Sequence, residues 1–427
     1  MNCTNCYEIT GGRPIKGIVT ANGNKNAALP CIAATLLTDE PVILRNLPEI
    51  EDVHVMLEIL EHLGSTVEKL EDHVYKVTTH NIKSCEILKE DSSKVRASIL
   101  FAGPLLGRMN EVILPPPGGD VIGRRRLDTH FLALEALGGK VDINGAFHIK
   151  ADKLKGGDIF LDEASVTATE NAIMAAVLAE GDTVLRNVAC EPHVQDLCNM
   201  LNLMGANITG IGSNNLYIKG QKKLHGADFA IGADFMEVGS FIGLTAATRG
   251  ELEIKNADPH HLRMCKIAFA KLGITWEDDG SSVFVPSNQK LEVVPDMGGM
   301  IPTISDAPWP AFPADLTSIM TVVATQVKGT VLIHEKMFES RMFFVDKLIG
   351  MGAGIILCDP HRAVVAGPSL LRGSNLVSPD VRAGMAMVIA ALCAEGKSVI
   401  NNVYQIERGY ENIAERLSNL GADITRL

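Results

Sequence analysis

The stretch Val42-Ile43-Leu44-Arg45-Asn46 decides the fold, because close copies of it recur along the chain. Each copy is a short apolar, mostly β-branched run that ends in a polar residue. The copies lie at residues 184–187, 252–256 and 399–402, with a divergent copy at residues 331–335. Residues such as valine and isoleucine favour strands and asparagine disfavours them, so each copy predicts a strand that stops at its last residue.

Six glycines mark helix ends around these strands. Each follows Leu or Met, and they stand roughly 70 residues apart, at Leu63-Gly64, Leu137-Gly138, Met204-Gly205, Leu272-Gly273, Met351-Gly352 and Leu420-Gly421. Glycine adopts the left-handed conformation of a helix C-cap at little cost, and this period is too long for the common solenoids. The same order of elements surrounds each glycine, which predicts a β-α-β-α-β-β unit repeated six times.

The helices that begin each unit carry almost no charge on any face, as at residues 171–180, 239–248 and 384–395. Such helices are buried on all sides, so we expect an apolar helical core with sheets outside it. A chain of 427 residues exceeds what one core normally holds. The sequence therefore predicts an α/β protein of two inside-out domains with three repeats each, divided near Ala233.

Composition narrows the class of protein. The chain is 46% apolar, 21% charged and 5% aromatic, which is typical of a soluble globular enzyme. The apolar run at residues 385–393 is far too short for a membrane span, and residues 1–10 do not have the pattern of a signal peptide. We expect a cytoplasmic protein that binds no membrane.

Nine cysteines, an odd number spread over expected helices and strands, are typical of free thiols in a reducing compartment. Cys3 and Cys6 form a Cys-x-x-Cys pair, but no second ligand pair accompanies it. A zinc site needs four ligands. We therefore expect no metal and two ordinary thiols.

The formal charge of −12 argues against nucleic acid as a partner. The arginines of residues 124–126 could still bind a small anion, because guanidinium groups suit oxyanions. The segments at residues 350–355 and 391–398 lack the glycine spacing and the context of a nucleotide-binding loop. The sequence implies neither NAD nor ATP, and we expect no cofactor.

Charged residues at the expected strand–helix junctions are the candidates for a site, and together they resemble a known family. The segments that carry the resemblance are residues 24–30, 95–98, 117–119 with 122–123, 310–315, 338–341 and 408–411. They closely resemble the UDP-N-acetylglucosamine 1-carboxyvinyltransferases, the enolpyruvyl transferases that begin bacterial peptidoglycan synthesis. The resemblance covers essentially the whole chain.

The resemblance implies a domain organisation and a place for the active site. The first domain is residues 25–232 and carries the loop with Asp120. The second is residues 1–24 plus 233–427 and carries Asp315 and Arg408. In this family the active site lies in the cleft between the domains, and the first strand belongs to the second domain.

The resemblance also implies a reaction, in which the enolpyruvyl group of phosphoenolpyruvate moves to the 3′-hydroxyl of UDP-N-acetylglucosamine and phosphate leaves. The residues implied for phosphoenolpyruvate are Lys25, Asn26, Arg96, Arg125 and Arg408. Those implied for the UDP-sugar are Arg96, Arg125, Asp128, His130, Ser165, Val166, Asp315 and Arg341. The implied catalytic residues are Asp120, Asp315, Lys25 and Arg408, with Asp315 as the base, Asp120 as the general acid and Asp380 as an orienting residue.

Four positions depart from the usual family pattern. Asp120 stands where most members have cysteine, and a carboxylate attacks an epoxide more slowly than a thiolate does, so we expect insensitivity to fosfomycin. Near the acceptor, Glu163 replaces lysine, Thr167 replaces glycine and Phe235 replaces arginine. These changes leave room for another acceptor, such as shikimate 3-phosphate or a free nucleotide.

Two further alternatives stay open. A non-catalytic relative could bind the nucleotide sugar as a regulator, although Lys25, Asp315 and Arg408 are retained. RNA-phosphate cyclases use a related repeat, but they need a nucleotide site and a basic face that this sequence lacks.

Overall fold

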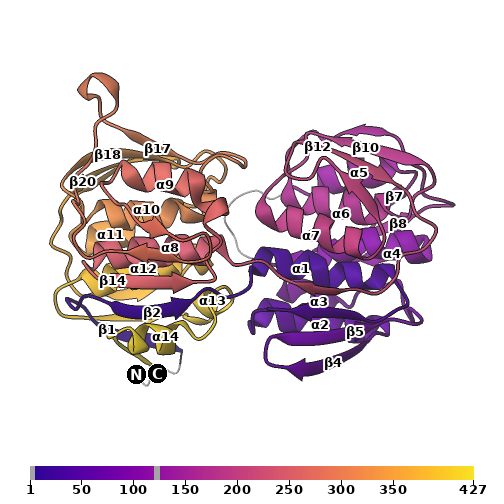
Figure 1. Cartoon of the computed structure of the whole chain (residues 1–427), viewed down its shortest axis with the longest axis horizontal. Helices are drawn as coiled ribbons and strands as arrows, with labels where there is room; N and C mark the ends of the chain where they lie inside the picture. The colour runs from indigo at the N-terminus through magenta and orange to yellow at the C-terminus, as the bar shows by residue number, and fades with distance from the viewer. Residues whose placement is uncertain (1–4, 120–125) are drawn as a thin grey trace. The chain divides into compact units, whose positions relative to one another are not determined.

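The computed structural model describes residues 5–119 and 126–427, which form two compact units. We call residues 23–119 with 126–232 the central unit, and residues 5–22 with 233–427 the terminal unit. In Figure 1 the central unit runs from violet to magenta, and the terminal unit combines the indigo start of the chain with its orange and yellow end. The chain crosses between units at residues 22–23 and 232–233, where the sequence predicts 24–25 and 232–233.

The central unit contains three sheets. Two have four strands, in the orders β13-β3-β5-β4 and β11-β12-β10-β9, and the third has the order β6-β8-β7. The strands are β3 (Val42–Arg45), β4 (Thr66–Glu71), β5 (Val74–Thr78), β6 (Glu111–Leu114), β7 (Lys140–Ile143), β8 (Phe147–Lys150), β9 (Asp158–Phe160), β10 (Asp182–Arg186), β11 (Asn207–Thr209), β12 (Asn215–Lys219) and β13 (Asp228–Ala230).

The terminal unit contains three four-stranded sheets, in the orders β21-β22-β1-β23, β15-β16-β14-β2 and β17-β18-β20-β19. The strands are β1 (Cys6–Thr10), β2 (Lys16–Thr20), β14 (Glu251–Lys255), β15 (Glu277–Asp278), β16 (Val283–Val285), β17 (Thr303–Ser305), β18 (Gly329–His334), β19 (Ile355–Asp359), β20 (Arg362–Gly367), β21 (Asn375–Val377), β22 (Lys397–Asn401) and β23 (Asp423–Arg426).

Every four-stranded sheet has one parallel pair and two antiparallel pairs, which is what a β-α-β-α-β-β unit produces. In the three-stranded sheet, an isolated parallel bridge between Glu86 and Ile113 stands where the other sheets have a further strand. Strands β1 and β2 join sheets of the terminal unit, as the resemblance implies: β1 pairs with β22 and β23, and β2 with β14. The predicted repeat is confirmed.

Both units also contain helices. In the central unit they are α1 (Lys25–Ala34), α2 (Glu51–Leu63), α3 (Lys89–Lys94), α4 (Ala102–Met109), α5 (Asp128–Ala136), α6 (Val166–Ala176) and α7 (Pro192–Leu203). In the terminal unit they are α8 (Phe235–Ala247), α9 (Arg263–Ala270), α10 (Thr317–Ala324), α11 (Val345–Gly350), α12 (Val381–Cys393), α13 (Tyr404–Glu407) and α14 (Ile413–Asn419). Short 3₁₀ helices are η1 (Thr35–Leu37), η2 (Arg96–Phe101), η3 (Pro259–Leu262), η4 (Met297–Gly299) and η5 (Ala314–Leu316).

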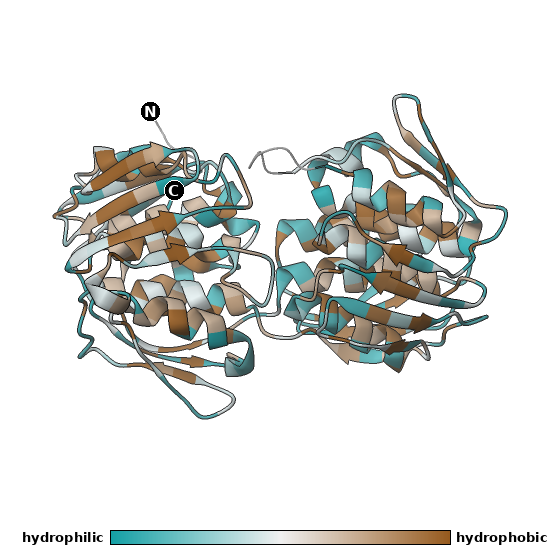
Figure 2. Ribbon diagram, turned by 90° about the horizontal axis from the view of Figure 1, so that it is seen from above, coloured by the Kyte–Doolittle hydropathy of each residue, from teal (hydrophilic) through white to brown (hydrophobic). Residues whose placement is uncertain are grey.

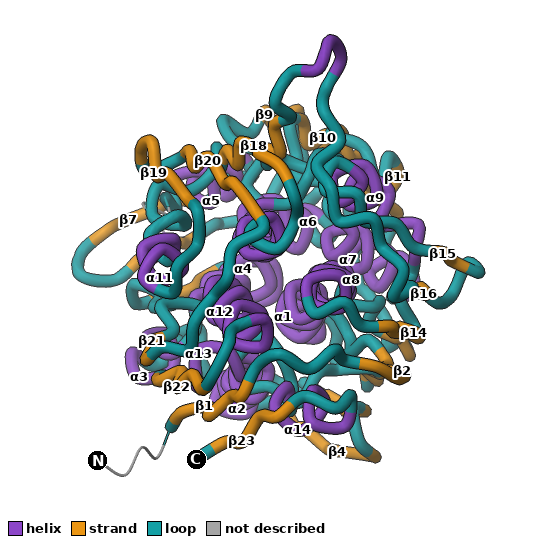
Figure 3. Tube along the Cα trace, turned by 90° about the vertical axis from the view of Figure 1, so that its left-hand side faces the viewer, coloured by secondary structure: helices purple, strands orange, loops and turns teal. Residues whose placement is uncertain are grey.

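The apolar helices are buried, as predicted. All residues of α8 and α10 and all but the last residue of α12 are buried, and these three helices contact one another. Figure 3 shows α8 and α12 inside the terminal unit, with β2, β14, β18, β20 and β22 around them. Figure 2 shows apolar residues in brown on helices and strands of both units. Each unit has its own hydrophobic core, which identifies the inside-out arrangement.

The recurring asparagines end their strands in the same way. Asn46, Asn187, Asn256 and Asn402 all have a φ between 52° and 59°. Each donates its side-chain N–H to the carbonyl oxygen of the residue that follows the neighbouring parallel strand: Ile231, Leu161, Ala21 and Ser378, respectively. Asparagine tolerates the left-handed conformation better than most residues, so it can end its own strand. Its side-chain amide also binds the backbone at the end of the neighbouring parallel strand.

The six predicted C-cap glycines all have a positive φ, from 72° at Gly273 to 109° at Gly64. The cysteines differ in part from the expectation. Cys6 is buried and disulfide-bonded, so it is not a free thiol, and Cys3 lies outside the described residues. Within the described ranges, no cluster of His, Cys, Asp and Glu could hold a metal ion, and no helix is long and apolar enough to cross a bilayer.

Candidate active site

Asp315 is the centre of a charged cluster in the terminal unit. It lies in η5, directly before α10, and its carboxylate accepts hydrogen bonds from two arginines. Arg341 Nη2 lies 2.5 Å from Oδ1, and Arg382 Nε lies 3.0 Å from Oδ2. Both arginine side chains are almost fully buried, at 9% and 6% exposed. The Asp315 side chain itself is 23% exposed, so its carboxylate, held by two buried guanidinium groups, can still be reached from solvent.

The electrostatics of Asp315 follow from this pairing. Burial alone would raise the pKa of Asp315, but the charges and hydrogen bonds of Arg341 and Arg382 hold it well below its ordinary value. Arg382 also lies over the ring of Tyr410, 5.3 Å from its centroid, and its own pKa is raised by Tyr410 and Asp315 in spite of burial. Asp315 is therefore ionised whenever both arginines contact it.

The two arginines keep unused donors. Arg341 Nε and Arg382 Nη1 are buried and have no hydrogen-bond partner among the residues that the structure describes. A buried donor without a partner costs about 1–3 kcal/mol, and more when it is charged. An anionic ligand beside Asp315 would satisfy these donors.

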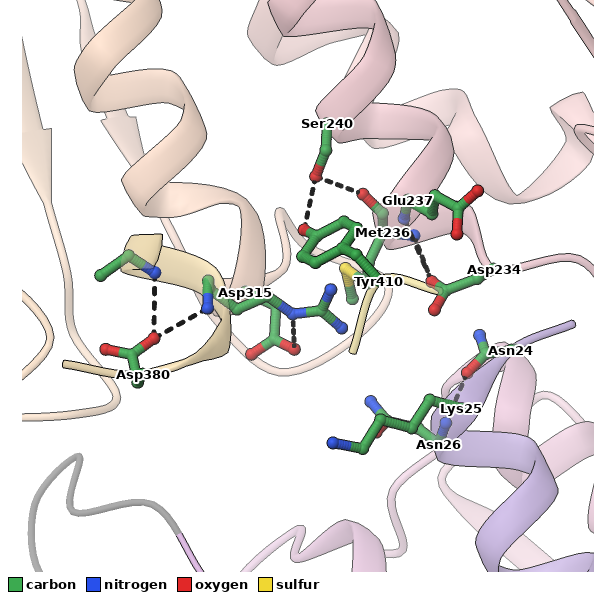
Figure 4. Close-up of polar contacts among 12 residues, drawn as sticks. Asn24, Lys25, Asn26, Asp234, Met236, Glu237, Ser240, Asp315, Asp380 and Tyr410 are labelled. Carbon is green, nitrogen blue, oxygen red and sulfur yellow. Dashed lines mark hydrogen bonds and ion pairs between the residues drawn. The ribbon is translucent and has the colours of Figure 1, made fainter. Parts of the chain in front are cut away.

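Two aspartates cap helices of the terminal unit that carry residues near Asp315. Asp380 caps α12, where Oδ1 accepts the N–H groups of Arg382 at 2.8 Å and Ala383 at 2.9 Å. Asp234 caps α8 in the same way through Met236 and Glu237, and the Tyr410 hydroxyl bonds to Ser240 of α8 at 2.8 Å (Figure 4). The predicted orienting residue Asp380 thus fixes the helix turn that carries Arg382.

Arg408 follows α13 and is only 7% exposed. Its Nη1 lies 3.3 Å from Gln405 Oε1. A buried guanidinium this close to a helix end can bind an anion without a large loss of side-chain entropy. Its place agrees with an anion-binding role, which stays a prediction.

In the central unit, Lys25 is the first residue of α1. Asn24 caps this helix, with Oδ1 accepting the N–H groups of Asn26 at 2.8 Å and Ala27 at 3.3 Å (Figure 4). Lys25 Nζ lies 2.6 Å from Asp52 Oδ2 of α2, and both side chains are largely buried, at 13% and 6% exposed. A lysine held beside a helix N-terminus offers an anion a fixed positive charge next to the positive end of the helix dipole.

Arg96 opens η2 and is half-buried, and burial lowers the pKa of its guanidinium. The residues that lead to position 120 are fitted closely to it. A Cβ at Gly119, whose φ is 105°, would come within 2.8 Å of Arg96 Cβ, and one at Gly118 would lie 1.9 Å from the Ser93 carbonyl oxygen. Both positions need glycine, so the start of the loop is fixed against Arg96. Asp120, Arg124 and Arg125 lie outside the described residues.

His130 belongs to a buried hydrogen-bond network. Its Nδ1 accepts from Asn171 Nδ2 at 2.9 Å, so its Nε2–H donates to Thr167 Oγ1 at 3.0 Å. Asn171 is also satisfied by Ile99 O and Gly103 N, each at 2.8 Å. Burial and then the charge of Arg96 lower the pKa of His130 to about 3. His130 is neutral, and its Nε2–H is already bonded to the Thr167 hydroxyl.

The remaining predicted residues lie near the start of two helices. Ser165 is the N-cap residue of α6 and Val166 its first residue, while Asp128 begins α5. Arg126 Nε lies 3.0 Å from Asp128 Oδ2, and Arg126 Nη2 lies 3.2 Å from Asp162 Oδ2. Arg126 therefore pairs with two carboxylates of its own unit.

Phe235, the last of the four departures, is buried against aromatic neighbours. Its ring centroid lies 5.5 Å from that of Trp309 and 6.2 Å from that of His261. The phenyl group therefore belongs to a local aromatic cluster.

Arg382 is one of the charged residues at the expected strand–helix junctions, but sequence reasoning assigned it no role; it is the second arginine that binds Asp315. Asp52, the buried partner of Lys25, was missed as a site candidate. The signal for Arg382 was its place as the only charge in an apolar helix. No sequence signal marked Asp52, because an acidic residue in the first turn of a helix is common.

Solved structures with the same architecture define the class of fold. The enolpyruvyl transferase NikO from Streptomyces tendae is 22% identical and matches with a TM-score of 0.88, covering 99% of each chain. An EPSP synthase from Acinetobacter baumannii is 16% identical, with a TM-score of 0.76, 98% of this chain and 99% of that one. The fold is thus that of the enolpyruvyl transferases.

Sequence comparisons give the family. Residues 9–417 match the family model of EPSP synthase (3-phosphoshikimate 1-carboxyvinyltransferase). A protein of Treponema denticola named UDP-N-acetylglucosamine 1-carboxyvinyltransferase is 65% identical over 98% of both chains, and a protein of that name from Treponema pallidum is 63% identical over 98% of this chain and 99% of its own. One of the same name from Bradyrhizobium diazoefficiens is 55% identical over 99% of this chain and 98% of its own. The chain belongs to the enolpyruvyl transferase family, in the group of the UDP-N-acetylglucosamine 1-carboxyvinyltransferases.

Proposed function

We propose that the protein transfers the enolpyruvyl group of phosphoenolpyruvate to the 3′-hydroxyl of UDP-N-acetylglucosamine in the cytoplasm, releasing phosphate. This reaction is the first committed step of peptidoglycan synthesis. The observation that carries the proposal is the identity of 55–65%, over nearly the whole chain, to proteins named for this activity. The charged clusters around Asp315 and Lys25 supply groups with the required chemistry.

Phosphoenolpyruvate carries a phosphate and a carboxylate, and the proposal assigns its binding to cationic side chains. Lys25, Arg96 and Arg408 are candidates whose side chains are at least partly buried. Fixed cations that are already desolvated stabilise charge that develops on oxygen without reorganising. Asn26 and Arg125 complete the proposed set.

Asp315 would take the proton of the acceptor hydroxyl. With both arginines in contact its carboxylate is a weak base, because they hold its pKa low. When Arg341 or Arg382 turns one of its donors to a substrate oxyanion, part of that stabilisation is lost and the basicity of Asp315 rises. Substrate binding would thus activate the base.

Asp120 would act as the general acid, protonating the methylene carbon of phosphoenolpyruvate or assisting the departure of phosphate. Its neighbours Gly118 and Gly119 lie close against Ser93 and Arg96, and Arg96 is itself a proposed phosphoenolpyruvate contact. Asp128, His130, Ser165, Val166 and Arg341 remain the proposed contacts of the UDP-sugar. For His130 the contact would pass through the Thr167 hydroxyl, since this hydroxyl occupies its Nε2.

A panel of acceptors tests the proposal. Phosphate release from phosphoenolpyruvate should require UDP-N-acetylglucosamine and should not occur with shikimate 3-phosphate or UDP alone. Asp315→Asn and Asp120→Asn should each lower kcat by at least about a hundredfold, because general acid–base groups contribute about 10²–10⁴-fold. Turnover with shikimate 3-phosphate in preference would refute the acceptor. Nucleotide-sugar binding without any turnover of the wild type would indicate the regulator, and full activity of Asp120→Asn would refute its role.

A further inference from the structure

The fifth repeat differs from the others where the parallel strands end. In four repeats an asparagine amide donates to a backbone carbonyl at this place. In the fifth, Glu335 directly follows β18 and Asp306 directly follows β17, so two carboxyl groups meet there. Both residues are 0% exposed. Two carboxylates in one buried place repel each other, so the pair must be stabilised by another means.

The hydrogen bonds show which oxygen atoms are already occupied. The Asp306 carboxylate accepts the N–H groups of Lys336 at 2.5 Å and Met337 at 3.2 Å. Glu335 Oε1 accepts those of Met337 at 3.3 Å and Phe338 at 3.2 Å. Glu335 Oε2 is buried and has no donor at hydrogen-bonding geometry among the described residues.

A proton on Glu335 resolves this arrangement. A protonated carboxyl group donates one O–H, and Asp306 is the acceptor beside it. Burial, the hydrogen bond with Asp306 and the charge of Asp306 raise the pKa of Glu335 to about 8, against the opposing effects of Arg341 and Thr317. His361, from the turn between β19 and β20, faces the backbone of Glu335, where its Nδ1–H donates to the carbonyl oxygen at 2.8 Å. At neutral pH Glu335 is therefore protonated and can donate its O–H to Asp306.

The segment that follows Glu335 contains Arg341, which contacts Asp315. Glu335 Oε1 accepts a hydrogen bond from the N–H of Phe338, and the guanidinium of Arg341 lies 5.0 Å from the centroid of the Phe338 ring. Arg341 in turn binds Asp315. The charge of Arg341 also reaches Glu335, since it acts to lower the pKa of that carboxyl. An ionised Glu335 would compete with Asp315 for Arg341.

We propose that Glu335 is a positioning residue of the transfer reaction: protonated and bonded to Asp306, it holds the loop of residues 335–341 and leaves the charge of Arg341 to Asp315. The inference rests on the proposed function, because Asp315 is the base in that reaction. It assigns the two carboxyls unequal roles. Asp306 is the acceptor that also binds the backbone N–H groups of Lys336 and Met337, and Glu335 must stay neutral.

Two variants, each of which replaces one carboxyl group by an amide of the same shape, test this asymmetry. In Glu335→Gln the amide N–H donates to Asp306 and Oε1 keeps both of its backbone donors. In Asp306→Asn one acceptor oxygen is lost and the charge moves to Glu335, next to Arg341. At pH 7 Glu335→Gln should keep kcat within about twofold, whereas Asp306→Asn should lower kcat by roughly tenfold or more with a smaller change in the KM for phosphoenolpyruvate.

The pH profile separates positioning from simple structural support. From about pH 6 to about pH 10, kcat of the wild type should fall as Glu335 ionises, and Glu335→Gln should lose that part of the decline. The infrared band of a protonated carboxyl group should titrate with a pKa of about 8 in the wild type and be absent from Glu335→Gln.

Three results would overturn the inference: an unchanged alkaline decline in Glu335→Gln, equal losses of kcat in the two variants, or failure of Glu335→Gln to fold, because its amide preserves every hydrogen bond. The infrared measurement needs no turnover. Inactive wild-type protein with an intact band would therefore count against the proposed function and not against the shared proton.

Discussion

Replacing Arg382 by methionine should destabilise the terminal unit in a way that depends on pH. Methionine keeps much of the length and apolar packing of the arginine stem, so the change removes mainly charge and hydrogen bonds. Arg382 is 6% exposed and its Nε lies 3.0 Å from Asp315 Oδ2. The substitution leaves Arg341 as the one guanidinium that binds Asp315.

The size of the effect follows from this geometry. Two unit charges 3.0 Å apart interact by about 5 kcal/mol at an effective dielectric constant near 20. Removing one partner of a buried pair typically costs about 3–5 kcal/mol, and the remaining Arg341 reduces the expected loss to about 2–4 kcal/mol. For a unit of roughly 200 residues this lowers Tm by roughly 5–12 °C.

The pH dependence gives the prediction its sign. The pKa of Asp315 is depressed in the folded protein, so its contribution is fully present above the pKa of the unfolded state, about 4, and is lost as the pH falls toward the folded value. The stability difference between wild type and Arg382→Met should be full near pH 7 and should shrink below about pH 4.

Thermal and urea unfolding between pH 7 and pH 3 measure this difference. Arg362→Met is a matched control in the same unit, because Arg362 also pairs with an aspartate, Asp359, but is 54% exposed. The control should change the free energy of unfolding by less than about 1 kcal/mol. An Arg382→Met loss below 1 kcal/mol at pH 7, or a loss that does not change with pH, would refute the reasoning.

Three further predictions concern other parts of the chain. Fosfomycin should leave no covalent adduct on the wild type by intact-mass spectrometry, whereas Asp120→Cys should gain one; an adduct on the wild type would contradict the expectation. Asp52→Asn should lower kcat/KM for phosphoenolpyruvate by roughly tenfold to a hundredfold, because Lys25 loses the carboxylate 2.6 Å away, with little change in the KM of the UDP-sugar; equal effects on both substrates would count against this. Asn187→Ala should cost about 2–3 kcal/mol of stability from the left-handed backbone and the lost hydrogen bond, and Asn187→Gly only about 1 kcal/mol, as chemical denaturation can show; an equal loss in both would exclude the backbone contribution.

The repeated fold could be predicted because its signals are local. A strand ended by Asn46 or Asn187 and a helix ended by Gly64 depend on residues a few positions apart, and the structure gives these residues the expected left-handed backbone. The absence of charge in residues 239–248 likewise predicts burial without knowledge of the neighbours. Local chemistry was sufficient for the architecture.

The candidate site could be predicted only in part, because ion pairs join distant residues. The resemblance indicates Asp315 and Arg341, but it did not yield Arg382 as the second arginine, which arrives 67 residues later in the chain. The sequence indicated the pair of Asp306 and Glu335 only weakly: Glu335 ends the divergent copy of the repeated strand, where other copies end in asparagine. Their shared proton depends on complete burial, which a sequence pattern does not contain.

Strands β1 and β2 precede the central unit in the chain but belong to sheets of the terminal unit, and this order has a consequence for synthesis on the ribosome. Residues 23–232 emerge as one continuous stretch, so the central unit can fold while translation continues. Strand β1 emerges before the central unit does, yet its partner β22 begins at Lys397. At about 5–20 residues per second β1 waits on the order of twenty to eighty seconds for that partner. During this interval the nascent chain carries an unpaired strand ahead of a folded central unit, and the terminal unit can close only after β22 and β23 have emerged.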